Sequence, residues 1–63
     1  MNIKSTGNGR YELEATRSEL ELLNNALNEV CNGVAIEDAE FATRLGASRR
    51  EARRLLDELS TVL

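Results

Sequence analysis

The sequence predicts a small α+β domain, in which an N-terminal β-hairpin is followed by three helices. Three observations carry this prediction. Apolar and polar residues alternate over residues 1–15 around a Gly-Asn-Gly turn, two S/T-x-x-E boxes begin at residues 16 and 48, and apolar residues recur at helical spacing after each box. A chain of 63 residues has room for one domain, 1–63, and little room for an internal pocket.

Residues 1–15 have the two-residue period of a strand pair. A three-residue loop, Gly7-Asn8-Gly9 with Gly9 left-handed, places every apolar side chain on one face. The predicted pairs are Thr6 with Arg10, Ser5 with Tyr11, Lys4 with Glu12, Ile3 with Leu13, and Met1 with Ala15. A two-residue Asn8-Gly9 loop would instead set Ile3 opposite Glu14. Because an isolated hairpin is marginal in water, its apolar face must lie on the helices or on a second copy.

The first helix is expected over residues 16–32, where Thr16 and Glu19 form a capping box. Its apolar stripe consists of Leu20, Leu23, Ala26, Leu27, Val30 and Cys31. Asn32-Gly33 ends the helix, with Val34 placed for the apolar contact of a Schellman turn. The asparagines at 24, 25, 28 and 32 form either a solvated face or a hydrogen-bonded partner interface.

Two short helices follow, over residues 37–45 and 48–60. Ile36 and Phe41 have the spacing of a hydrophobic staple, with Glu37 or Asp38 as the cap. Gly46 suits a left-handed position after the first of these helices, and Ser48 with Glu51 makes the second capping box. The apolar faces are expected to close on each other. They consist of Phe41, Ala42 and Leu45 on one helix and Ala52, Leu55, Leu56 and Leu59 on the other.

The spacing of small residues in the second half of the chain leads to a functional hypothesis. Ala42, Gly46 four residues later and Ala52 ten residues later resemble the DNA-binding helix-turn-helix over residues 38–57, about 20 of the 63. The resemblance implies a recognition helix beginning at Ser48, as part of a homodimer that reads two half-sites. The outward positions on that helix would be Ser48, Arg49, Arg50, Arg53 and Arg54. Of these, Arg49, Arg50 and Arg53 would read guanine edges, while Arg44 and Arg54 would hold phosphates.

The charge of residues 44–54 supports DNA binding, whereas the net charge of the whole chain opposes it. Five of the eight basic residues lie between residues 44 and 54, where Glu51 is the only acid, so this window carries +4. The whole chain carries −3, which would repel a polyanion. Two interpretations therefore stand. The first is a small DNA-binding regulator. The second is an acidic protein-interaction module, of the inhibitor or immunity type, in which the two-helix corner is only structural and the arginines are solvated or ion-paired.

Other function classes find little support. The chain has no histidine, one cysteine and no glycine-rich phosphate loop, so we expect no enzyme activity, no cofactor and no metal site. Cys31 lies on an apolar stripe and is read as a small buried hydrophobe, with a reactive thiol as the alternative. No apolar run is long enough for a membrane span, and the chain start lacks a signal-peptide core. A cytoplasmic protein is expected, with double-stranded DNA or a protein as partner and homo-oligomerisation.

Overall fold

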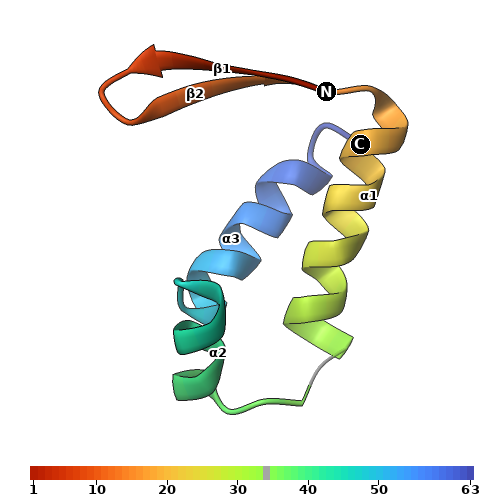
Figure 1. Ribbon diagram of the computed structural model, residues 1–63. Helices are drawn as coiled ribbons and strands as arrows, with labels where there is room; N and C mark the ends of the chain where they lie inside the picture. The colour runs from red at the N-terminus through yellow and green to blue at the C-terminus, as the bar shows by residue number, and fades with distance from the viewer. Residues whose placement is uncertain (34) are drawn as a thin grey trace.

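A computed structural model describes residues 1–33 and 35–63, and it confirms the predicted α+β class. A two-stranded antiparallel hairpin precedes three α-helices (Figure 1). The elements are β1 Asn2–Gly7, β2 Arg10–Glu14, α1 Arg17–Asn28, a π-helical turn η1 Glu29–Gly33, α2 Asp38–Leu45 and α3 Arg49–Ser60. The contact expected of Val34 lies outside the described residues.

The hairpin has the predicted register, reached by a different turn. Ile3 pairs with Leu13, Lys4 with Glu12 and Ser5 with Tyr11, as expected. The pairing of Thr6 with Arg10 is wrong, because Gly7 pairs with Arg10 and the register shifts between Ser5 and Gly7. Asn8 and Gly9 both have positive φ, 55° and 73°, as in a type I′ turn whose twist matches that of the strands. A β-bulge around Thr6 then restores the apolar register that a two-residue loop alone would lose.

The predicted helix starts are confirmed. Thr16 caps α1 and Ser48 caps α3, each in a reciprocal capping box with the glutamate three residues on. Gly46 has φ 73° and ends α2 in the left-handed conformation. The end of α1 differs from the expectation, because Gly33 does not take the positive φ of a Schellman turn. The chain widens into η1 instead.

Helices α1 and α2 both pack against α3. Helices α1 and α3 run side by side in opposite directions, α2 lies at one end of the pair, and the hairpin lies at the other (Figure 1). The Cα atoms span 33 × 27 × 16 Å, so the molecule is flattened. A stable domain normally buries its core between two packed layers. Among the described residues, neither strand of the hairpin packs over the helices as such a second layer.

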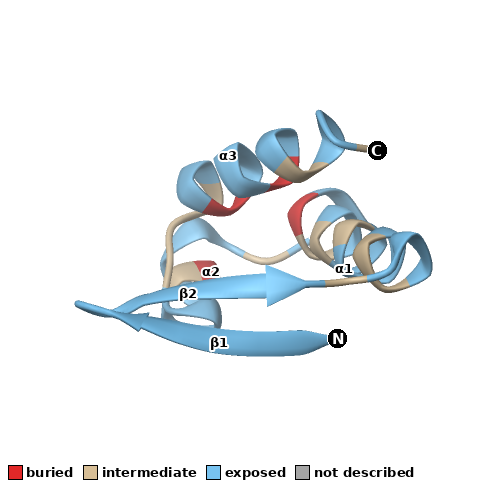
Figure 2. Cartoon of the chain, turned by 90° about the horizontal axis from the view of Figure 1, so that it is seen from above, coloured by how far each residue is buried: buried red, intermediate tan, exposed pale blue. Residues whose placement is uncertain are grey.

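The fully buried core is small and lies where the three helical elements meet (Figure 2). It consists of Cys31, Phe41, Ala52 and Leu56, against which Leu27, Val30 and Ile36 pack. The burial of Cys31 confirms its reading as an apolar core residue. The packing of Ile36 on the cluster that contains Phe41 agrees with the predicted staple.

The hairpin is almost detached from this core, and every residue of both strands is exposed (Figure 2). One polar link ties its start to α1, where the terminal ammonium of Met1 donates to Glu19 Oε2 at 2.7 Å. This hydrogen bond, together with those from the Thr16 backbone N–H and hydroxyl, lowers the pKa of Glu19 to about 2. Because every strand residue is exposed, the apolar face of the hairpin is largely unpacked.

Candidate functional site

Arg49 is the first residue on the arginine-rich side of α3, and its sequence position predicted an outward orientation. Arg49 instead folds back on the molecule, with 23% of its side chain exposed. Its guanidinium lies 4.5 Å from the centre of the Phe41 ring, whose residue is completely buried. The outward orientation expected of Arg49 is therefore not observed, while its contact with a base edge stays a prediction.

All three guanidinium nitrogens of Arg49 are bonded within the chain. Nη1 donates to the Cys31 carbonyl at 3.0 Å, Nη2 to the Ile36 carbonyl at 2.7 Å, and Nε to Asp38 Oδ1 at 3.1 Å. The Cys31 carbonyl lies in the last turn of the first helical segment, where carbonyls lack intrahelical partners and the helix dipole favours a cation. Arg49 is thus a clamp that joins the start of α3 to the end of η1 and to the start of α2.

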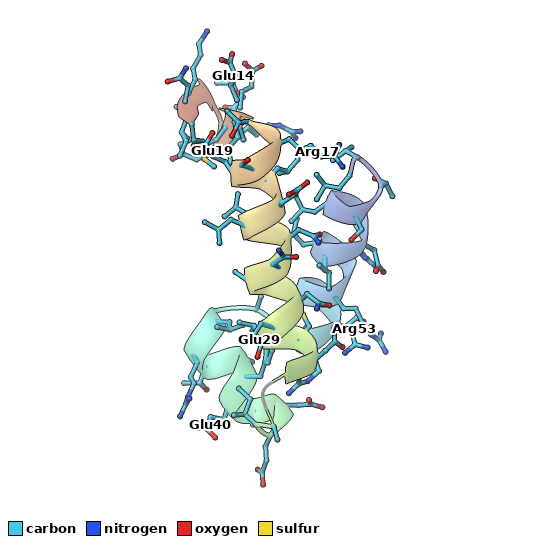
Figure 3. All side chains as sticks on the ribbon, turned by 90° about the vertical axis from the view of Figure 1, so that its right-hand side faces the viewer. Glu14, Arg17, Glu19, Glu29, Glu40 and Arg53 are labelled. Carbon is cyan, nitrogen blue, oxygen red and sulfur yellow. The ribbon has the colours of Figure 1, made fainter. Side chains whose placement is uncertain are left out.

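Arg53 has a related role one turn further along α3. Its Nη2 donates to the Cys31 carbonyl at 3.4 Å and to Asn32 Oδ1 at 3.2 Å. Figure 3 shows Arg53 on α3 beside the end of the first helical segment that carries Glu29. The Cys31 carbonyl therefore receives two guanidinium groups. Arg53 remains largely exposed, but its position is set by this bridge.

Two of the four asparagines bridge helical segments within the chain, a use that neither predicted alternative, a solvated face or a partner interface, includes. Asn24 Oδ1 accepts from the Ser60 hydroxyl at 3.1 Å, and Asn32 accepts from Arg53 and donates to Asn28 Oδ1 at 2.9 Å. Asn24 and Asn32 therefore link α1 and η1 to α3. Asn25 is exposed. Spacing along one helix could not reveal these bridges, because their partners lie 21 and 36 residues away.

The other predicted DNA contacts divide into two groups. Ser48 is half-buried and its hydroxyl accepts from the Glu51 N–H as the N-cap, while Arg44 pairs with Glu40 at 2.6 Å. Arg50 and Arg54 are exposed, and among the described residues neither has an ion pair within 4.0 Å. The arginine side also carries acids, because Asp38 and Asp57 line the same shallow hollow as arginines 49, 50, 53 and 54.

An apolar groove on the helices is a second candidate site. The sequence analysis expected its residues on the helices to lie in the core. Its volume is about 730 Å³. Its lining is almost wholly apolar: Leu13, Leu23, Ala26, Leu27, Val30, Leu45, Ala47, Glu51, Ala52, Leu55 and Leu59. The expectation that the apolar faces of the last two helices close on each other is only partly met. Phe41, Ala52 and Leu56 are buried, but Leu45 remains 45% exposed and Leu55 51% exposed.

The groove continues onto the hairpin. Leu13 lines one end of the groove, and Ile3 lies directly opposite Leu13 in the strand register, so both side chains share a face. Tyr11 lies on that face too, because it is two residues from Leu13. Ile3 and Tyr11 are each 64% exposed. The two apolar surfaces therefore meet at Leu13, and together we call them the apolar concavity: the groove residues with Met1, Ile3 and Tyr11.

The described residues hold neither a metal-binding cluster nor a membrane-spanning helix. In residues 1–33 and 35–63, no cluster of three His, Cys, Asp or Glu side chains could hold a metal ion. Over the same residues, no helix combines the length and apolar character needed to cross a bilayer. Comparison with protein-family models, curated proteins and solved structures found no significant match.

Proposed function

We propose that this protein is a small protein-interaction module that works as a homodimer, with the corner between α2 and α3 serving a structural purpose. The observation that carries the proposal is the apolar concavity, whose leucines on the helices and apolar side chains on the hairpin remain exposed. Contiguous exposed apolar surface of this kind usually marks a protein interface. The occupant that we propose is a second copy of the same chain.

The surface area supports this occupant. The accessible surface is 5109 Å², whereas a compact monomer of 7.0 kDa exposes about 4,000 Å². The radius of gyration is 13.0 Å, against about 11 Å for a compact chain of 63 residues. Each chain thus exposes about 1,100 Å² more than a compact fold would. Covering that excess on both copies would bury about 2,200 Å² in total, within the range of obligate homodimers.

The use of the arginines also supports an interaction module over a DNA reader. Arg49 is committed to its clamp, Arg53 to its bridge and Arg44 to Glu40. Arg50 and Arg54 share the exposed side of α3 with Asp57 and Glu58, which lie three and four residues after Arg54. A dimer would carry −6, a charge that disfavours a polyanion and favours a basic protein surface.

Two adjacent leucines on α1 provide a matched test. Leu23 lines the groove, whereas Leu22 is 69% exposed and does not. Size-exclusion chromatography with light scattering should show a dimer for the unmodified chain and for Leu22→Glu. Leu23→Glu should give a monomer, because it would place an unpaired charge in the interface. Circular dichroism checks that both variants stay helical. An unmodified chain that is monomeric at tens of micromolar contradicts the proposal.

DNA binding is the second candidate, favoured by one specific observation. Arg50 and Arg54 lie one turn apart near the start of α3, exposed and without ion pairs among the described residues. We propose for this case that the pair contacts a duplex, as the helix-turn-helix resemblance implies. A mobility-shift series at increasing salt tests it: each phosphate contact should contribute a slope of about −0.9 in log affinity against log salt. Arg50→Ala with Arg54→Ala should abolish binding, and absence of a shift at low salt excludes this candidate.

A further inference from the structure

We infer that the hairpin of each copy lies over the helical groove of the other, so that the dimer forms by reciprocal packing of hairpins on helices. This inference rests on the proposed homodimer and specifies its interface. The described residues form two exposed apolar surfaces, one on the hairpin and one on the helices. The two surfaces meet only at Leu13. A two-fold related copy supplies the missing partner to both at once.

The two faces of the hairpin explain which side would be buried. One face carries Met1, Ile3, Tyr11 and Leu13, all between 47% and 64% exposed. The opposite face carries Asn2, Lys4, Glu12 and Glu14, in which Lys4 pairs with Glu12 in the register. An amphipathic strand pair is stable only when its apolar face is covered, since an isolated hairpin is marginal in water. The charged face would then remain in solvent.

The dimensions of the two surfaces agree. The apolar row of the hairpin runs from Tyr11 to Ala15, which is about 14 Å at 3.4 Å per residue. The floor of the groove runs from Leu23 on α1 to Val30 in η1 and from Ala52 to Leu59 on α3, which is about 11 Å at 1.5 Å per residue. One hairpin is therefore long enough to cover the floor of one groove.

The hairpin cannot cover its own groove fully in the observed conformation. Only Ala15 and the N-cap Thr16 connect β2 to α1, so the hairpin can move little relative to this helix. The ion pair between Met1 and Glu19 holds the other strand at the same end of α1. The hairpin is consequently held at one end of the groove and reaches it through Leu13 only. Its remaining apolar side chains extend past the helices. They are available to another molecule.

Cross-linking between copies tests this arrangement. In a Cys31→Ala background, chains carrying Ile3→Cys are mixed with chains carrying Leu55→Cys and treated with a short bismaleimide. A product that contains one chain of each kind is expected, because Leu55 lies in the groove and Ile3 on the apolar face of the hairpin. Lys4→Cys is the matched control, since it lies on the opposite face of the same strand, and should give far less of the mixed product.

Light scattering on Ile3→Glu and Lys4→Gln separates this inference from the proposed function. Ile3→Glu should weaken dimerisation at least about tenfold, and Lys4→Gln, which avoids a second acid opposite Glu12, should leave it within about threefold. A dimer that depends on Leu23 but ignores Ile3→Glu, and that gives no mixed cross-link, overturns the reciprocal hairpin and leaves the homodimer standing. A chain that is monomeric under all conditions overturns both. Saturable capture of a different protein by a monomeric chain would also overturn the second-copy occupant.

Discussion

Removal of the Arg49 guanidinium should destabilise the protein although the residue is charged and lies in the first turn of a helix. Two hydrogen bonds reach partly buried carbonyls, those of Cys31 and Ile36, and each is worth about 1.5 kcal/mol at the low end for a charged donor. Stacking on Phe41 adds about 1 kcal/mol. The contact with Asp38 adds little, because that carboxylate is 89% exposed.

These terms sum to about 4 kcal/mol, and the entropy of ordering an arginine side chain offsets about 1–2 kcal/mol of that sum. The expected loss of unfolding free energy for Arg49→Ala is therefore about 2–3 kcal/mol. That is large for a chain whose single core supplies about 3–5 kcal/mol. Urea unfolding followed at 222 nm measures it, at one fixed protein concentration because dimerisation couples to stability. With a slope of about 1 kcal/mol per molar urea, the midpoint should fall by about 2–3 M.

Arg50→Ala is the matched control for this experiment. It removes the same group from the adjacent residue, which is exposed and has no ion pair among the described residues. Its effect on stability should stay within about 0.5 kcal/mol. Equal losses for the two variants, or a loss below about 0.5 kcal/mol for Arg49→Ala, would refute the assignment of Arg49 as a clamp.

Three further predictions concern local structure. Gly46→Ala should cost about 1–2 kcal/mol, because φ is 73° and a Cβ is strained there; thermal unfolding would show it, and an unchanged midpoint would contradict it. Ser48→Ala should cost about 1 kcal/mol by removing the cap of α3, whereas Ser48→Asp should restore most of the loss. The pKa of Glu19 is lowered to about 2, so its contribution to stability is complete above about pH 4.5 and is lost as the pH falls toward 2. Acid titration of Glu19→Gln should therefore show a shallower loss over that window, and a curve parallel to that of the unmodified chain would refute the role of this carboxylate.

The sequence alone determined the local features of the chain. Both capping boxes, the left-handed Gly46 and the pairing of Ile3 with Leu13 follow from interactions within a few residues or from a strict two-residue period. The predicted three-residue loop of the hairpin was wrong, because Gly7 pairs with Arg10 and leaves a two-residue loop. The type I′ geometry at Asn8-Gly9 and the bulge around Thr6 together meet the same requirement that a longer loop was expected to meet.

Only the tertiary structure decided how the long polar side chains and the leucines are used. Arg49 and Asn24 find partners 18 and 36 residues away, and nothing in the spacing of α3 distinguishes Arg49 from the neighbouring Arg50. In the same way, helical periodicity marks Leu23 and Leu55 as apolar-face residues but cannot say whether the covering surface comes from the same chain. Periodicity reports which side of a helix avoids water. What lies against that side depends on how the elements pack in three dimensions, and among the described residues neither strand of the hairpin packs over the helices.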